Sequence, residues 1–242
     1  MKSFLKNNRS RIEKELGQTR HWPYFSPAIY CQYRVMLPAA QRHAHGDLID
    51  LGCGDMPYRS ALMSQVSAYD GLDLFPRSDQ VRYASDLEAM TVIPDQSYDT
   101  ALMIEALEHV PHPWLALAET WRILKPGGTL ILSVPHLSRL HDEPHDYFRY
   151  TKHGLRRLLE DSGFEIIDLI KKGGIFSFLG HQVSTLILTL SWGIPVLRWV
   201  VFFLNRWLIT HPCFILDQWL DRGGLSPLGY VAVARKVMAP PG

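Results

Sequence analysis

The chain has 242 residues, 47% hydrophobic and 20% charged, a balance that suits one large globular domain or one domain with a sizeable insertion. A formal net charge of +1 gives no overall attraction to nucleic acid, which is therefore not an expected partner. Three cysteines without a CxxC pair argue against a disulfide framework and favour a reducing, cytoplasmic compartment.

Residues 1–45 are predicted to form an N-terminal arm and a cap. Up to Arg20 the sequence is polar and basic with apolar residues at helical intervals, which predicts a short surface helix or a mobile arm rather than a signal peptide. From His21 to Leu37 aromatic residues crowd together and are interrupted by prolines. That mixture favours an irregular cap over a pocket, with plain core packing as the alternative.

The middle of the chain alternates short apolar runs with amphipathic stretches of helical length, which is typical of strand–helix–strand units around a parallel sheet. Helices are expected at 114–124, ended by the Lys-Pro-Gly-Gly run, and from the cap Thr151 to Ser162. The sequence therefore predicts a doubly wound α/β domain over residues 46–172 and 228–238. Its expected strands are 47–51, 68–74, 98–105, 129–134, 165–170 and 230–237.

Residues 173–227 are predicted to be an apolar helical insertion before the last strand. No Asp, Glu, Lys or Arg occurs from Gly173 to Leu197. If the flanking strands share one sheet, the chain leaves and returns on one side, which excludes a single transmembrane crossing. As a helix, 183–194 would span about 18 Å, short of the roughly 30 Å hydrocarbon core, and Pro195 interrupts its continuation.

The composition of the insertion favours a helical hairpin lying on a membrane surface. Arg198, Asn205 and Arg206 fall near one another on a helical wheel and leave an apolar surface elsewhere. Such a hairpin would carry tryptophans at the level of the lipid headgroups, namely Trp192, Trp199 and Trp207. The alternatives are a subdomain buried against the core or in a homodimer.

A turn rich in glycine follows the first expected strand, as Asp50-Leu51-Gly52-Cys53-Gly54. Glycines let a backbone turn sharply and approach a ligand closely, although this run alone could also open a dinucleotide site. The next strand ends at Asp73, near the spacing at which an acidic side chain bonds ribose hydroxyls. Met56-Pro57 stand where a dinucleotide site would want a third glycine, which favours a cofactor without phosphate.

At these residues the sequence resembles the class I S-adenosylmethionine-dependent methyltransferases, specifically the type 11 group. The resemblance covers about residues 46–172 and the final strand, and implies a Rossmann-like sheet with mainly parallel strands and an antiparallel last strand. Its motifs occur in the family's order, as Asp47 to Gly54, Gly71-Leu72-Asp73-Leu74, Ser85-Asp86-Leu87, Tyr98-Asp99-Thr100, Glu105 to Val110, Leu124 to Leu130 and His145 to Thr151.

The resemblance also implies roles for individual residues. The methionine and ribose part of the cofactor, S-adenosyl-L-methionine, would be lined by Asp50, Gly52 and Gly54, with Asp73 holding the ribose. Adenine would meet Asp86 and Leu87, and Glu105 would lie near the amino-acid moiety. Met56 departs from the family's third glycine. For single residues a plain structural role stays open, since Asp86 could cap a turn and Glu108 could be a surface charge.

Methyl transfer from a sulfonium needs a dedicated base only when the acceptor is a weak nucleophile such as a hydroxyl. Candidates gather in the loop after the fourth long strand. We expect His145 to be the base with Asp146 orienting it, and Tyr147 and Arg149 to hold the acceptor, unless the loop is only a lid. His109 is a second candidate for the pocket wall. The histidines and acids of this loop could also suggest a metal site, but no metal is expected, because the cofactor's chemistry needs none.

These patterns predict an S-adenosylmethionine-dependent methyltransferase acting on a hydroxyl of a small-molecule, glycan or lipid-linked acceptor. It would be cytoplasmic and peripheral on the inner face of the membrane. One alternative is a soluble small-molecule O-methyltransferase whose insertion makes a homodimer and a lid. The other is an inactive, membrane-associated scaffold that binds the cofactor, although a scaffold has no need of Asp50 and Asp73.

Overall fold

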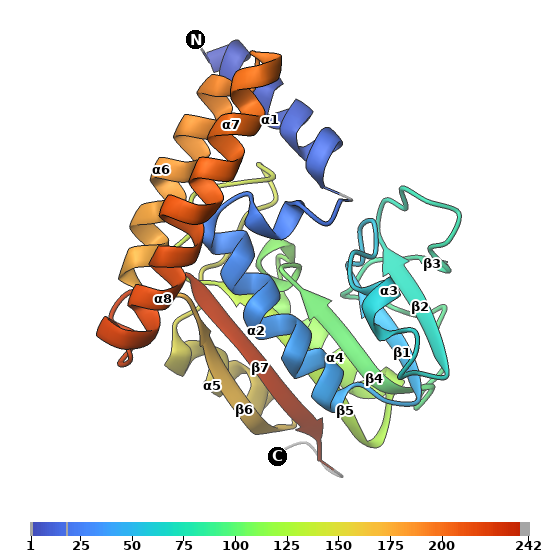
Figure 1. Cartoon of the computed structure of the whole chain (residues 1–242). Helices are drawn as coiled ribbons and strands as arrows, with labels where there is room; N and C mark the ends of the chain where they lie inside the picture. Colours follow the sequence, from blue (N-terminus) through green and yellow to red (C-terminus); the bar gives the residue numbers. More distant parts are fainter. Residues whose placement is uncertain (1, 18, 238–242) are drawn as a thin grey trace. The chain divides into compact units, whose positions relative to one another are not determined.

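The computed structural model describes residues 2–17 and 19–237 and divides into two compact units (Figure 1). The helical unit combines Met1–Val35 with Lys171–Leu228, and the sheet unit combines Met36–Ile170 with Gly229–Gly242. The expected arm and the expected insertion thus fall into one unit. Met1, Gln18 and Met238, which fall within the predicted arm and the predicted domain, lie outside the described residues.

A seven-stranded sheet with the order β3-β2-β1-β4-β5-β7-β6 organises the sheet unit. Neighbouring strands from β3 to β5 run parallel, whereas β7 is antiparallel to β5. The predicted fold class, including the antiparallel last strand and the helical insertion before it, is confirmed. The strands are β1 (Asp47–Leu51), β2 (Ala68–Asp73), β3 (Tyr83–Ala84), β4 (Tyr98–Ile104), β5 (Leu124–Pro135), β6 (Phe164–Lys172) and β7 (Gly229–Lys236).

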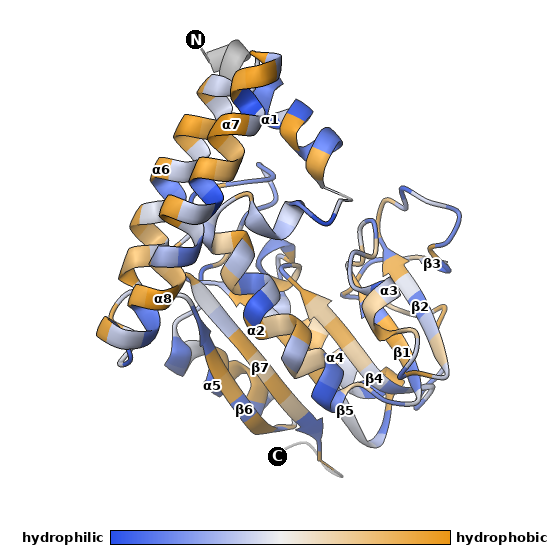
Figure 2. Cartoon of the chain, viewed as in Figure 1, coloured by the Kyte–Doolittle hydropathy of each residue, from blue (hydrophilic) through white to orange (hydrophobic). Residues whose placement is uncertain are grey.

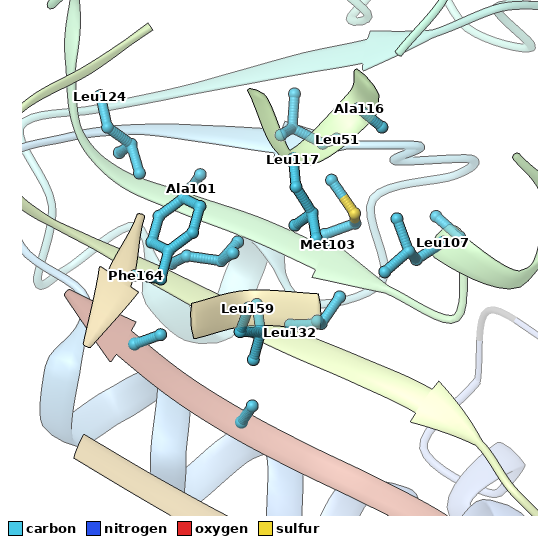
Figure 3. Packing of buried hydrophobic residues seen from close by; sticks show 14 of the residues in the cluster. Leu51, Ala101, Met103, Leu107, Ala116, Leu117, Leu124, Leu132, Leu159 and Phe164 are labelled. Atoms are coloured by element: carbon cyan, nitrogen blue, oxygen red, sulfur yellow. The ribbon is translucent and has the colours of Figure 1, made fainter. Parts of the chain in front are cut away.

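The core of the sheet unit is aliphatic because its central strands are apolar on both faces, as parallel strands covered by helices require. Side chains from β4 and β5, such as Met103 and Leu132, meet those from α4 (Pro113–Ile123) and α5 (Lys152–Asp161) (Figure 3). Each large side chain buried in this way stabilises the fold by roughly 1.5–3 kcal/mol. This packing holds the carboxyl ends of the strands in fixed positions.

Most predicted element boundaries lie within a few residues of the observed ones. The Thr151 hydroxyl accepts a hydrogen bond from the Gly154 N–H at 3.0 Å, so the expected helix cap of α5 is present. The sequence did not reveal β3, α3 (Arg59–Leu62) or the 3-10 turn η2 (Leu107–His109), which are too short to show a periodicity.

The expected irregular cap over 21–37 was wrong for most of its length. Residues 22–24 form the short 3-10 turn η1 (Trp22–Tyr24), but from residue 27 onward the chain forms the regular helix α2 (Pro27–His43). Proline is well tolerated at the first position of a helix, where its missing N–H is not needed. Pro27 therefore starts a helix, although the sequence suggested an interruption.

Long apolar helices form the bulk of the helical unit (Figure 2). One continuous helix, Pro195–Leu220, has 26 residues and spans about 39 Å, so it is long and apolar enough to cross a bilayer. The length argument from 183–194 was therefore too restrictive, because the chain breaks only at 192–194. The segments of the unit are α1 (Lys2–Leu16), α6 (Ile175–Ser191), α7 (Pro195–Asn205), the π-helix η3 (Arg206–Thr210) and α8 (His211–Leu220).

Polar side chains hold these helices together from the inside. Asn205 is buried, accepts from the Ser184 hydroxyl at 2.6 Å and donates to the Phe25 carbonyl at 3.0 Å. Asp217, also buried, accepts the backbone N–H groups of Phe176 and Ser177 and so caps the start of α6. The polar stripe predicted on this helix therefore faces inward, and its apolar face is exposed.

Trp192 was predicted to lie at the surface, and this prediction was wrong. Its side chain is fully buried, and its indole N–H donates to Glu15 at 3.2 Å. The Arg198 guanidinium reaches the same carboxylate at 2.7 Å. These bonds join α1 to the turn between α6 and α7, whereas Trp207 is largely exposed as expected.

Candidate functional site

The turn after β1 brings backbone N–H groups to the end of the neighbouring strand. Gly52 and Gly54 adopt φ of +70° and +50°, which glycine reaches without strain. A Cβ on Gly52 would lie 2.7 Å from the Cβ of Ala106, whereas one on Gly54 would meet open space. Gly52 is therefore needed for packing against the loop after β4, and Gly54 borders free volume.

Met56, which stands where many relatives have a third glycine, adopts a left-handed backbone conformation. Its φ is +49°, a left-handed value that a non-glycine residue adopts at a cost of about 1–3 kcal/mol. The side chain is buried, and a Cβ on Gly71 would lie 2.9 Å from its sulfur. Packing of the Met56 side chain over Gly71 therefore holds the loop in this conformation.

Asp73 ends β2 beside this turn, and its carboxylate organises the loop. One oxygen accepts the Gly54 N–H at 2.9 Å and the other accepts the Phe75 N–H at 2.9 Å. The side chain is only partly buried, so a ligand can reach it. The two predicted elements of the ribose site, the glycine turn and this acid, therefore lie together.

Asp50 lies deeper than the other acid of this region. Its side chain is buried and accepts a hydrogen bond from the Tyr69 hydroxyl at 2.6 Å. Burial raises the pKa of this carboxyl to about 7; the Tyr69 bond opposes the rise and the nearby Asp73 adds to it. At neutral pH Asp50 is poised between its two forms, and a cationic ligand nearby would favour the charged one.

The remaining residues predicted to contact the cofactor follow β3 and β4. The Asp86 carboxylate accepts the Glu88 N–H at 2.9 Å and closes a turn, which is the plain structural role noted for it. Leu87 is half-buried against the core. Glu105 has φ of +50° and accepts from the Ser133 hydroxyl at 2.7 Å, so its carboxylate is held at the end of β4.

The loop after β5 arranges the predicted catalytic residues differently from the expectation. The Asp146 carboxylate accepts hydrogen bonds from both terminal nitrogens of Arg149, at 2.6 and 2.7 Å, and from the backbone N–H of His141 at 2.9 Å. These bonds hold the pKa of Asp146 well below its usual range, with Arg149 as the main cause. The expected Asp146–His145 pair is thus replaced by an Asp146–Arg149 pair.

Arg149 and His145 consequently differ in their freedom to act. The Arg149 guanidinium also donates to the backbone carbonyls of Ser138, Arg139 and Phe148, which occupies it within the loop. His145 is exposed, and its Nδ1 lies 3.1 Å from the hydroxyl of the exposed Tyr147. Of the four predicted residues, these last two are exposed, whereas Arg149 is partly exposed and the Asp146 side chain is nearly buried.

A buried carboxylate between two histidines is the feature that the sequence did not reveal. Glu108 is fully buried, which corrects its interpretation as a surface charge. One of its oxygens lies 3.8 Å from the Nε2 of His109 and 3.8 Å from the Nε2 of His141. The adjacency of Glu108 and His109 was a signal for this cluster, but the approach of His141 depends on the folded loop. Such a cluster can hold a proton or a divalent cation.

A family model described as a methyltransferase domain matches residues 22–169. A probable S-adenosylmethionine-dependent methyltransferase of Mycolicibacterium smegmatis is 30% identical over 159 residues, covering 58% of this chain and 59% of that protein. A ubiquinone biosynthesis O-methyltransferase of Xanthomonas campestris is 32% identical over 117 residues, covering 43% and 46% respectively. The chain spans about half the length of these curated relatives.

Solved structures of the same fold include the cyclase SpnF, with a TM-score of 0.58 at 18% identity, covering 85% of this chain and 81% of that one. Another is the 1,6-didemethyltoxoflavin-N1-methyltransferase of Burkholderia thailandensis, solved with S-adenosylhomocysteine. It has a TM-score of 0.51 at 19% identity and covers 88% of this chain and 78% of that one. At these identities the likeness concerns the fold.

Proposed function

The chain belongs to the methyltransferase domain family, and from this premise we propose that it transfers the methyl group of S-adenosylmethionine to a hydroxyl group. The observation that carries the proposal is the arrangement at the carboxyl ends of neighbouring strands. Asp73 and the glycine turn lie at β2 and β1, and the cluster around Glu108 follows β4. Open α/β sheets bind their ligands at this edge.

The cofactor would occupy the turn after β1. Asp73 would bond the ribose hydroxyls, Gly52 and Gly54 would let the backbone approach, and Asp50 would face the methionine part. Asp86, Leu87 and Glu105 are proposed to complete the pocket, the first two at the adenine. The sulfonium supplies an activated methyl carbon, so the protein's main contribution is to place the acceptor in line with it.

A hydroxyl acceptor is supported by the bases at the end of β4 and in the loop after β5. A hydroxyl is a weak nucleophile that needs a base to take its proton during the transfer, whereas a thiolate or an unprotonated amine can attack without one. His145 and Tyr147 are exposed there, while Asp146 and Arg149 hold the loop in shape. The resemblance to an O-methyltransferase over 117 residues points the same way.

The experiment incubates the purified protein with S-adenosylmethionine and panels of soluble phenols, glycans and polyprenyl-linked sugars. Mass spectrometry of the products would reveal one added methyl group, and the bond type would follow from fragmentation. Methylation at oxygen supports the proposal, whereas transfer exclusively to nitrogen or sulfur overturns it. A sample without enzyme controls for spontaneous methylation.

A lipid-linked acceptor on the cytoplasmic face of a membrane is the candidate that the helical unit favours. Its large exposed apolar side chains include Val183, Leu186, Phe203, Leu208 and Trp219, while the polar residues Asn205 and Asp217 of the long helix Pro195–Leu220 are buried. Apolar surface of this extent on several adjacent helices is more than a monomer in water usually exposes. Homodimerisation is the other way to cover it.

The geometry of α1 favours a hairpin lying on the membrane over one that spans it. Glu15 bonds Trp192 and Arg198 near the turn of the hairpin, and Arg11 pairs with Glu15 on the same helix. A crossing would carry these charges through the hydrocarbon core, which is unfavourable by several kcal/mol for each charge. Because β6 and β7 are neighbours in one sheet, the hairpin must also return to its starting side.

A further inference from the structure

The donor atoms of Glu108, His109 and His141 converge on one small volume. All three offer one ligand atom each, and these atoms lie within 4.8 Å of one another. The carboxylate is fully buried, whereas each imidazole is partly exposed and open to a small ion. Arg149 already interacts electrostatically with this carboxylate, and a cation bound between the two imidazoles would stabilise the buried charge further.

The imidazoles of His109 and His141 are each held in place by contacts of their Nδ1 atoms, while their Nε2 atoms lie near the Glu108 carboxylate. The Nδ1 of His109 lies 2.6 Å from the carbonyl oxygen of His145. The Nδ1 of His141 lies 3.2 Å from the carbonyl oxygen of Arg139 and 3.5 Å from the Asp146 carboxylate.

Carbonyl and carboxylate oxygens only accept, so these contacts place the proton of each ring on Nδ1. The Arg149 guanidinium lies 3.5 Å from the Nδ1 of His141 and, as a donor, would favour an unprotonated Nδ1. The contacts with the Arg139 carbonyl and the Asp146 carboxylate favour a protonated Nδ1 more strongly, because there are two of them and the first is shorter. Each Nε2 then presents its lone pair beside Glu108. Protein metal sites orient their histidine ligands in this way.

We propose that Glu108, His109 and His141 bind one divalent transition-metal ion, such as zinc or manganese. Two imidazole nitrogens and one carboxylate oxygen suit these ions better than magnesium or calcium, which prefer oxygen ligands. Three protein ligands leave at least one coordination position open for an exchangeable ligand. This inference departs from the expectation, drawn from the sequence, that the site needs no metal.

The open position would take the acceptor's hydroxyl oxygen, a role that rests on the proposed O-methylation. Coordination lowers the pKa of the hydroxyl, and its proton leaves to water. The oxygen then forms a bond to the methyl carbon while the carbon–sulfur bond breaks. The electron pair of that bond stays on sulfur, so the products are the methyl ether and neutral S-adenosylhomocysteine.

The test titrates the full-length, tag-free and metal-stripped protein with zinc or manganese alone, by calorimetry. One equivalent of the metal should bind. Each of the single variants Glu108→Gln, His109→Gln and His141→Gln should weaken its affinity by about 10- to 100-fold. His153→Gln serves as the matched control, because this exposed histidine lies on α5 outside the cluster. Unchanged affinity for S-adenosylhomocysteine would show that each variant is folded.

Two results would overturn the metal site. One is no stoichiometric binding of either ion, as expected if protonated histidines neutralise Glu108 instead. The other is equal binding by the three cluster variants and His153→Gln. Metal binding without any O-methylated product would support the metal site and reject the proposed hydroxyl acceptor. O-methylation at full rate by metal-stripped protein in the presence of a chelator would support the hydroxyl acceptor and reject the role of the metal.

Discussion

The two compact units differ in how much of their apolar surface they leave exposed to solvent. In the sheet unit the interior is aliphatic, with Leu102, Met103 and Leu132 fully buried between strands and helices. In the helical unit Asn205 and Asp217 are buried, and much of the aliphatic and aromatic surface is exposed. Apolar burial therefore stabilises the whole interior of the sheet unit, whereas the helical unit has a smaller apolar cluster that includes Trp192 and Phe202 and leaves many other apolar side chains in contact with solvent.

The difference fits the proposal that one chain combines a cofactor site in the sheet unit with an apolar contact surface on the helical unit. Apolar packing is dense and holds strand ends in place, which suits a site that must orient two substrates. In the helical unit, buried polar side chains add directional hydrogen bonds to a smaller apolar cluster, and many apolar side chains stay exposed. Ser184 and Asn205 form one such bond across two helices.

The largest expected effect separates the two units by stability in aqueous buffer. Leu132→Ala removes a buried side chain and should lower the free energy of unfolding by about 2–5 kcal/mol. Leu208→Ala removes an exposed one and should change it by less than about 0.5 kcal/mol. Denaturant titration measures both. Equal losses would mean that Leu208 is covered in solution and would favour a homodimer.

A second prediction concerns the cofactor and should leave the helical unit unaffected. Asp73→Ala removes the carboxylate that accepts the Gly54 and Phe75 N–H groups, and should weaken S-adenosylmethionine binding by about 10- to 100-fold. Calorimetry measures the affinity, and Asp79→Ala on the exposed loop nearby is the control. Unchanged affinity in Asp73→Ala would remove this residue from the proposed ribose site.

The sequence predicted the sheet unit well because its signals are local. Strand positions follow from apolar runs, and the turn after β1 follows from Gly52 and Gly54. What it could not show is how loops distant in sequence meet. The separation of 33 residues between Glu108 and His141 contains no periodicity that would bring them together, and the pairing of Asp146 with Arg149 depends on the folded loop.

In the helical unit the pattern was identified but its direction was misjudged. Arg198, Asn205 and Arg206 do lie on one side of their helix, as the wheel predicts. In water that side would normally face solvent, yet Asn205 is buried, and Arg198 bonds Glu15. A helical wheel shows which residues share a face, and only packing partners decide which face turns inward.

A third prediction follows from the burial of Asp50. Because its pKa is raised to about 7 in the folded protein, the folded state binds a proton that the unfolded chain releases near pH 4. The contribution of Asp50 to the free energy of unfolding should therefore fall by about 4 kcal/mol as pH rises from about 4 to about 7.

Asp50→Asn should lose this pH-dependent fall, while Asp79→Asn, on an exposed loop, should keep it. Denaturant titrations at several pH values measure the slope of each variant. A wild-type slope that matches Asp50→Asn would contradict the assignment. Comparing the stability of Asp50→Asn and Asp79→Asn at neutral pH also shows whether the buried Asp50 carboxyl destabilises the sheet unit.

The smallest expected effect tests what covers the exposed apolar face. If that face lies on a membrane, the wild-type protein should float with anionic liposomes, and Leu208→Ser should reduce its partition coefficient about fivefold, equivalent to about 1 kcal/mol of apolar burial. Leu140→Ser is the matched control, because Leu140 is equally exposed but belongs to the sheet unit. A similar loss in both variants would show nonspecific adsorption. A wild-type protein that stays at the bottom as a dimer would assign the face to a second copy of the chain.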